Sequence, residues 1–278
     1  MTYESFDLSF DGGVAHLKLN RPEKRNAMTE SFWRELPDAV EAAEAEPGTR
    51  VLVLSSTGPH FCSGLDISMF QSTAEMAPES PNARLRFLDT LQYLLDAVQV
   101  VDRVRIPVIA VIQGGCIGGG VDLVSGCDIR IASSDAFFRI EEINIGMMAD
   151  LGTLQRLPKL IPDGVARELA YTGAALSADR AERLGLVNAV HPSHEEAVEA
   201  ALAMARTIAE KSPIAVAGSK GMMTYARDHS VAESIEHMKG YQAAIFNIGD
   251  IMESYTAKME KRPARFEDLP APRARSNP

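Results

Sequence analysis

The chain has 278 residues, of which 46% are hydrophobic and 24% are charged. This balance is typical of a folded protein and excludes bulk disorder. The 38 acidic and 28 basic residues give a formal net charge of −10, so we expect no nucleic-acid partner and no anionic membrane surface. No apolar run comes near the roughly 20 residues that a membrane-spanning helix needs, which predicts no membrane insertion.

The chain ends and the cysteines bear on the compartment. The first residues show neither a signal peptide nor the arginine-rich pattern of a mitochondrial transit segment. The last three residues are not a peroxisomal address. Cys62, Cys116 and Cys127 form no CxxC pair and fit a reducing compartment. We therefore expect a cytoplasmic protein.

The first half of the chain predicts strands that alternate with helices. Alternating apolar residues around Gly12-Gly13 predict a β-hairpin within residues 3–19. The other expected elements are a helix between Thr29 and Pro47, a strand at 51–54, a helix through 88–98, a strand at 107–112, a helix from Val121 and a strand at 129–132. This order predicts an α/β core with parallel strands.

The second half of the chain predicts helices. Helical stretches are expected at 198–209, 213–226, 231–247 and 250–261, and no strong strand pattern occurs beyond residues 186–190. We expect an α/β core at residues 1–200, a helical segment at 201–262 and a proline-rich extended tail at 263–278.

Two loops, at residues 60–67 and 114–122, each follow a predicted strand. Ligands of open α/β folds bind beyond the carboxyl ends of strands. The second loop is rich in glycine and opens a helix, so two loop amides that meet at one point would form an oxyanion hole. Tight packing alone is the alternative. The motifs GxGxxG, GxxxxGK[ST] and GxSxG do not occur in these loops, which weakens nucleotide-binding and serine-hydrolase readings.

Three carboxylates stand among apolar residues: Asp122, Glu142 and Asp150. Burying a carboxylate is costly unless it is hydrogen-bonded or protonated, so these groups are candidates for raised pKa values and acid/base catalysis. Each could instead cap a helix or pair with a base such as Arg139 or Arg156.

The glycine loops, the acidic residues and several further motifs together resemble the crotonase (enoyl-CoA hydratase/isomerase) superfamily over about residues 3–260. The matching motifs lie at 20–28, 63–66, 118–120, 152–157, 176–181, 185–187 and 212–213. Within that superfamily the chain is most similar to the Δ3,5-Δ2,4-dienoyl-CoA isomerases. Hydratases usually have glutamate in place of Asp122 and glycine in place of Asp150.

The resemblance implies a crotonase-like α/β fold, a ββα spiral core with a helical C-terminal oligomerisation segment, in a homotrimer or homohexamer. It implies an acyl-CoA thioester substrate, no metal and no cofactor apart from the CoA of the substrate. The implied oxyanion hole consists of the N–H groups of Leu65 and Gly119. The implied substrate-binding residues are Ser63, Gly64, Leu65, Asp66, Ile67 and Gly119. Without organelle signals, we expect a bacterial cytoplasmic member.

The three carboxylates then predict isomerisation of 3,5-dienoyl-CoA to 2,4-dienoyl-CoA in fatty-acid β-oxidation. Glu142 would remove the C2 proton and Asp150 would protonate C6, because C2 and C6 lie roughly 5 Å apart and one carboxylate cannot easily serve both. Asp122 would orient a neighbour or tune its pKa. The alternatives are an enoyl-CoA hydratase, a Δ3-Δ2-enoyl-CoA isomerase, and a catalytically silent assembly or RNA-binding member.

Overall fold

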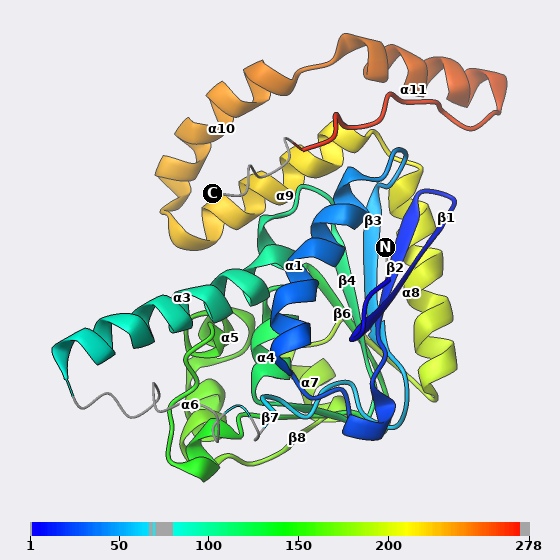
Figure 1. Cartoon of the computed structure of the whole chain (residues 1–278). Helices are drawn as coiled ribbons and strands as arrows, with labels where there is room; N and C mark the ends of the chain where they lie inside the picture. Colours follow the sequence, from blue (N-terminus) through cyan, green and yellow to red (C-terminus); the bar gives the residue numbers. More distant parts are fainter. Residues whose placement is uncertain (1, 67–68, 70–79, 273–278) are drawn as a thin grey trace.

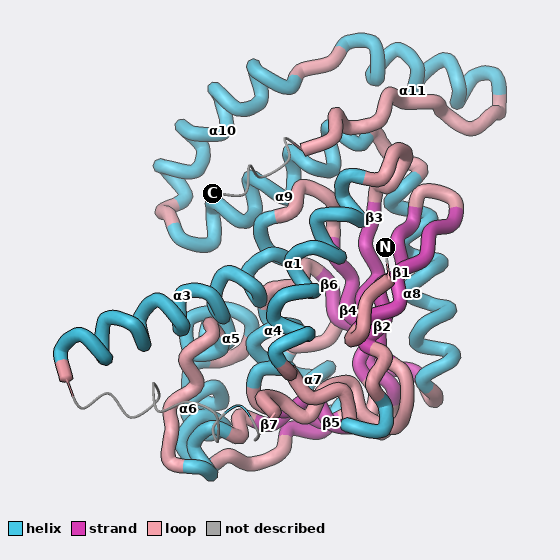
Figure 2. The backbone as a smooth tube through the Cα atoms, viewed as in Figure 1, coloured by secondary structure: helices cyan, strands magenta, loops and turns pink. Residues whose placement is uncertain are grey.

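The computed structural model describes residues 2–66, 69 and 80–272, and a six-stranded sheet lies at the centre of this part of the chain (Figures 1 and 2). The strands are ordered β1-β2-β3-β4-β6-β9, with β1 and β2 antiparallel and the others parallel. Their bounds are β1 Phe6–Asp11, β2 Val14–Leu19, β3 Val51–Ser56, β4 Val108–Ile112, β6 Ile129–Ser133 and β9 Ala189–His191. The predicted hairpin and parallel core are confirmed.

Both faces of this sheet are covered, which explains the continuous apolar runs. On one face Val53, Ile109 and Val111 pack against α8 (His194–Ala209), whose Ala197, Ala201 and Ala205 are fully buried. Alanines four residues apart lie on one face of a helix and let it approach the sheet closely. The expected domain boundary at residue 200 falls inside α8, so the core layer extends to the end of that helix.

The opposite face packs against α1 (Glu30–Ala45) and α3 (Pro81–Arg103). Leu52, Leu54 and Ala110 point to this side, since neighbouring strand residues alternate between faces. The helices between β4 and β9 are α4 (Gly119–Ser125), α5 (Thr153–Leu160), α6 (Asp163–Thr172) and α7 (Ala178–Leu184). Short 3-10 helices include η1 (Pro22–Lys24) and η3 (Glu142–Ile145). α4 begins two residues before the predicted start at Val121.

A small second sheet carries the glycine-rich loop (Figure 2). Its strands are β5 (Gly115–Ile117), β7 (Phe137–Arg139) and β8 (Leu176–Ser177), in the order β5-β7-β8. The sequence did not predict them, because strands of two or three residues are too short to show a period.

The C-terminal helices are α9 (Pro213–Asp228), α10 (Val231–Ile245) and α11 (Ile248–Glu260), in agreement with the expected helical stretches. In Figure 1, α10 and α11 arch away from the sheet, and no residue of α10 is buried. The tail returns to the core, where Arg50 Nη2 lies 2.9 Å from Asp268 Oδ1 and Arg105 Nη2 donates to Pro270 O at 2.8 Å. Within the described residues, no helix combines the length and apolar character needed to cross a membrane.

Candidate active site

One cavity of about 540 Å³ brings most of the predicted site residues together. It lies between α3, η3 and the two loops, and its wall includes the predicted residues Ser63, Gly64, Leu65, Gly119, Glu142 and Asp150. Asp66 and Asp122 do not line it. Ile67 lies outside the described residues.

Backbone hydrogen bonds join the two loops. Cys62 N–H donates to Gly115 O at 3.1 Å, and Ile117 N–H donates to Cys62 O at 3.0 Å. Gly64 has a φ of +85°, and a Cβ there would lie 3.0 Å from Ile117 O and 3.7 Å from Gly119 N. Glycine at position 64 therefore allows the first loop to come against the turn that begins α4.

The amides of Leu65 and Gly119 differ from their neighbours in hydrogen bonding. Gly118 N–H donates to Arg139 O at 2.9 Å, and Asp66 N–H donates to Met28 O at 3.1 Å. Among the described residues, neither Leu65 N–H nor Gly119 N–H makes a backbone hydrogen bond, and both residues line the cavity. Two such donors on one wall have the composition of an oxyanion hole.

Glu142 reaches the turn at Gly118. A Cβ at Gly118 would lie 3.0 Å from Glu142 Oε1, which places the carboxyl group against the start of α4. Glu142 Oε2 is buried without a hydrogen-bond partner among the described residues. Burial, with smaller contributions from the charges of Asp122 and Asp150, raises the pKa of Glu142 to about 7. A carboxyl group with a pKa near neutrality suits general base catalysis.

Asp122 lies beneath the cavity, with 1% of its surface exposed. Its Oδ1 accepts a hydrogen bond from Thr153 N–H, the first residue of α5, at 2.6 Å. The helix-capping alternative therefore holds for Asp122. Its Oδ2 has no hydrogen-bond partner in the described part of the chain, and burial raises its pKa to about 6.

Asp150 is half-buried, and burial raises its pKa. The ion-pair alternative fails for all three carboxylates within the described residues, because Arg139 pairs with Glu141 at 3.8 Å and Arg156 pairs with Asp102 at 3.4 Å. The charges of Asp122 and Asp150 raise the pKa of Glu142, and the charge of Asp150 raises the pKa of Asp122.

Most of the apolar part of the wall was not predicted from sequence. It includes Met28, Trp33, Phe87, Leu91, Leu94, Ile145, Met147 and Leu151. The sequence signal for this wall was in α3, whose apolar residues are not confined to the core-facing side of the helix. Leu85 and Leu88 are accordingly 60% and 57% exposed. An apolar wall with a few convergent polar groups is typical of small-molecule sites.

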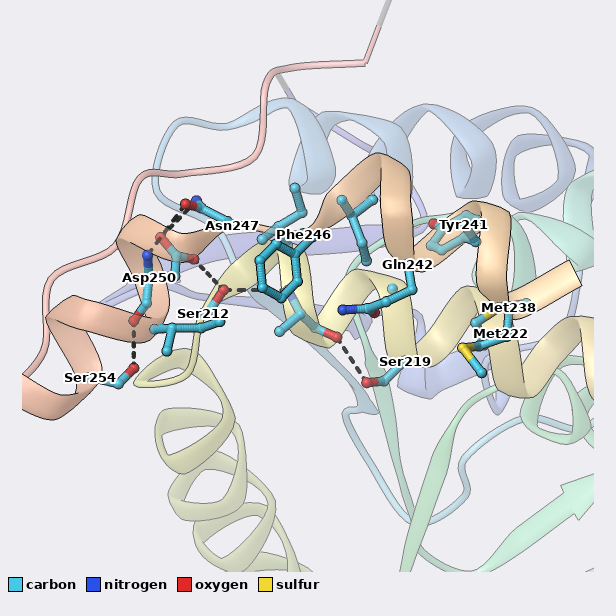
Figure 3. A pocket seen from close by; sticks show the side chains of 15 residues that line it. Ser212, Ser219, Met222, Met238, Tyr241, Gln242, Phe246, Asn247, Asp250 and Ser254 are labelled. Carbon is cyan, nitrogen blue, oxygen red and sulfur yellow. Dashed lines mark hydrogen bonds between the residues drawn. The ribbon is translucent and has the colours of Figure 1, made fainter. Parts of the chain in front are cut away.

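A second cavity, of about 480 Å³, lies between α9, α10 and α11 (Figure 3). Its carboxylate, Asp250, accepts hydrogen bonds from Ser212 Oγ and from Asn247 Nδ2. No predicted site residue lines it. In the described ranges, no group of three or more His, Cys, Asp or Glu side chains is arranged to hold a metal ion. The unpaired carboxylates make the first cavity the candidate active site.

Comparisons with known proteins identify the family of this chain. A family model described as enoyl-CoA hydratase/isomerase matches residues 9–269. A mitochondrial Δ3,5-Δ2,4-dienoyl-CoA isomerase of Rattus norvegicus is 42% identical over 95% of this chain and 82% of its own length. A peroxisomal Δ3,5-Δ2,4-dienoyl-CoA isomerase of Arabidopsis thaliana is 39% identical over 96% and 98%. The crystal structure of an enoyl-CoA hydratase from Bacillus anthracis has a TM-score of 0.86 and 28% identity over 95% of this chain and 99% of its own.

These comparisons confirm the predicted α/β crotonase-like fold and correct the predicted location. The expectation of a bacterial cytoplasmic protein is wrong, because the similar isomerases are named as mitochondrial or peroxisomal enzymes of eukaryotes. That expectation depended on the absence of targeting patterns, and an absent pattern is not a physical property that determines a compartment.

Proposed function

The chain belongs to the enoyl-CoA hydratase/isomerase family, and on this premise we propose that it isomerises 3,5-dienoyl-CoA to 2,4-dienoyl-CoA. The observation that supports this most is that Glu142 and Asp150 line one cavity and make no ion pair within the described residues, and burial raises the pKa of both. The names of the similar isomerases support the same activity.

The first step is removal of a proton from C2. The thioester oxygen accepts hydrogen bonds from the N–H groups of Leu65 and Gly119, which stabilise the negative charge that develops on it. Glu142 takes the C2 proton, and the electron pair of the broken C–H bond enters the conjugated dienolate. A donor of this kind contributes roughly 100- to 1,000-fold to the rate.

The second step is protonation of C6. Asp150 gives its proton to C6, and the dienolate returns its charge to form the conjugated 2,4-diene. The step leaves Glu142 protonated and Asp150 ionised, so both exchange a proton with water before the next turnover. The negative charge of Asp122 beneath them raises the pKa of Glu142.

The rest of the assignment follows from the same chemistry. The reaction moves one proton and transfers no electrons, so we propose that it uses no metal and no cofactor beyond the CoA of its acyl-CoA substrate. The oligomeric state is a separate proposal: we propose a homotrimer or homohexamer joined through the C-terminal helices. Large exposed apolar side chains there support this: Met223, Phe246, Ile248, Met252, Tyr255 and Met259.

An ultraviolet assay with 3,5-octadienoyl-CoA tests the proposed function. The conjugated 2,4-dienoyl product should accumulate without added metal or redox cofactor. The same preparation is assayed for water addition to a 2-enoyl-CoA, since a hydratase shares the fold. Faster hydration than isomerisation would favour the hydratase alternative, and no turnover of either substrate would favour a silent family member.

A further inference from the structure

Asp150 belongs to the walls of two cavities. The first is the cavity of about 540 Å³ that forms the candidate active site, which we call the acyl cavity. The second is a cavity of about 660 Å³ between α3, α5 and α9, which we call the polar cavity. The cations of this second wall are Arg156, Lys159 and Arg227. Asp150 therefore shares a cavity wall with three cations, and nearby positive charge stabilises an ionised carboxylate.

Asp102, near the end of α3, pairs with two of these cations. Its carboxylate accepts hydrogen bonds from Arg227 Nη1 at 3.1 Å and Nη2 at 3.0 Å, and from Arg156 Nη2 at 3.4 Å. The side chains of Asp102 and Arg156 are only 14% and 12% exposed, so solvent screens this pair weakly. Within the described residues, Arg156 has no other carboxylate partner at ion-pair distance.

The Arg156 guanidinium also contacts the chain next to Asp150. Gly152 has a φ of +120°, and a Cβ there would lie 2.2 Å from Arg156 Nη1. The charge of Arg156 already lowers the pKa of Asp122. A change in its compensation would therefore act directly on the loop that carries Asp150.

We propose that Asp102 is a positioning residue for Asp150: it pairs with Arg156 and Arg227, and so prevents them from drawing the Asp150 carboxyl group away from the acyl cavity. The inference rests on the proposed function, in which Asp150 must remain protonated and face C6. Asp102 lies on the polar cavity and does not line the acyl cavity.

Ionisable groups from several helices and loops line the acyl cavity and the polar cavity, whose walls share Asp150. On the acyl side and beneath it they are Glu141, Glu142 and Asp122, and on the polar side they are Asp102, Arg156, Lys159, Arg227 and Asp228. Lys159 pairs with Asp228. Removing the charge of Asp102 leaves Arg156 as the uncompensated cation nearest in sequence to Asp150.

Asp102→Asn tests the proposal, with product formation and C2 proton exchange in heavy water measured side by side. We expect product formation to fall at least about 30-fold, since loss of a general acid costs roughly 100- to 10,000-fold. Exchange at C2 should stay within about threefold, because Glu142 and the amides are unchanged. The pH at which activity falls through loss of the Asp150 proton should move down by about 1 unit.

A double variant separates charge compensation from structural support. Asp102→Asn with Arg156→Met removes the uncompensated cation, so it should regain at least about tenfold in product formation over Asp102→Asn alone. Asp228→Asn is the matched control, because it neutralises a carboxylate at the exposed end of the same cavity and should leave the ratio of product to exchange unchanged.

Two kinetic results would each overturn the inference: an unchanged ratio of product to exchange in Asp102→Asn, or a double variant more impaired than the single one. A carbon-13 NMR titration of Asp150, assigned by its loss in Asp150→Asn, gives a readout that is independent of turnover. The pKa of Asp150 should fall in Asp102→Asn, and an unchanged value contradicts the proposal. A wild-type protein that does not isomerise 3,5-dienoyl-CoA would instead refute the proposed function.

Discussion

The acyl cavity and the cavity between the C-terminal helices α9, α10 and α11, here called the groove, differ in how their polar groups are hydrogen-bonded. In the acyl cavity and beneath it, Glu142 Oε2 and Asp122 Oδ2 are buried without hydrogen-bond partners in the described chain. In the groove, Asp250 is hydrogen-bonded, and large apolar side chains are exposed, including Phe246 at 60% exposure. The acyl cavity therefore contains buried carboxylates that destabilise the fold but suit catalysis. The groove instead exposes apolar surface of the kind found at protein–protein contacts.

The sharpest way to break this comparison is to neutralise the two carboxylates of the acyl cavity separately. Glu142→Gln should lose both C2 exchange and product, because the dienolate never forms. Asp150→Asn should keep exchange with heavy water and lose product. Each loss should be roughly 100- to 10,000-fold.

The control for this pair is Glu141→Gln, since Glu141 lines the same cavity but is paired with Arg139. Circular dichroism should first show that all variants fold. Wild-type isomerisation by Asp150→Asn would make Asp150 structural. Exchange that survives in Glu142→Gln and vanishes in Asp150→Asn would reverse the two roles.

Gly119→Val should lose about 100- to 1,000-fold in kcat, equivalent to about 3–4 kcal/mol. A Cβ at position 119 would lie 2.7 Å from Met28 Sδ, so the larger side chain must displace the sulfur or shift the amide away from the thioester oxygen. Gly164→Val is the control, because nothing lies within 4 Å of a Cβ there. A folded Gly119→Val protein with near-normal kcat would contradict the assignment of this amide.

Stability should depend on pH through Glu142. Its pKa is raised from 4.5 to about 7, so its contribution to folding is fully present below pH 4.5 and is lost as the pH rises through 7. Glu142→Gln should therefore be more stable than wild type at pH 8, by about 1–3 kcal/mol, and show little difference at pH 4. Urea unfolding at both pH values measures this, and equal differences at the two values would show that burial of the charge carries no cost.

The smallest expected effect sharpens the other half of the comparison. Phe246→Ser in the groove should change the unfolding free energy of the dissociated chain by no more than about 0.5 kcal/mol, because the side chain is already exposed. The same substitution should weaken self-association in sedimentation velocity. An unchanged association constant would show that this side chain is not part of a subunit interface.

The fold was predictable from sequence where local patterns are strong. The apolar runs of β3 and β4 are buried on both faces, and the alternation around Gly12 marks the hairpin, because these signals depend only on near neighbours in sequence. The strands β5, β7 and β8 were missed. They are short and depend on pairing with residues distant in sequence. The isolated backbone β-bridge between Cys62 and Cys116, whose thiols are free, is an example of such distant pairing.

The residue types of the site were predictable from the sequence, but the depth at which each residue lies relative to the cavity was not. The apolar flanks of Glu142 and Asp150 marked them as candidates, and the fold brings both to one cavity. Helix capping was one of the alternatives for Asp122, but the helix that it caps, α5, could not be predicted, because its partner Thr153 is 31 residues away. The Asp102 network was equally hidden, since Asp102 is 54 residues from Arg156 and 125 from Arg227.

The return of the tail to the core gives the C-terminal helices two anchors. Arg227 in α9 binds Asp102 where the segment leaves the core, and Arg50 binds Phe266 O and Asp268 where it comes back. The helices α10 and α11 therefore form a closed loop and not a free arm, and much of their conformational entropy is already lost before any partner arrives. Docking onto another surface then costs less entropy, and a protease cut at the link between α10 and α11 would leave each piece attached to the body of the protein.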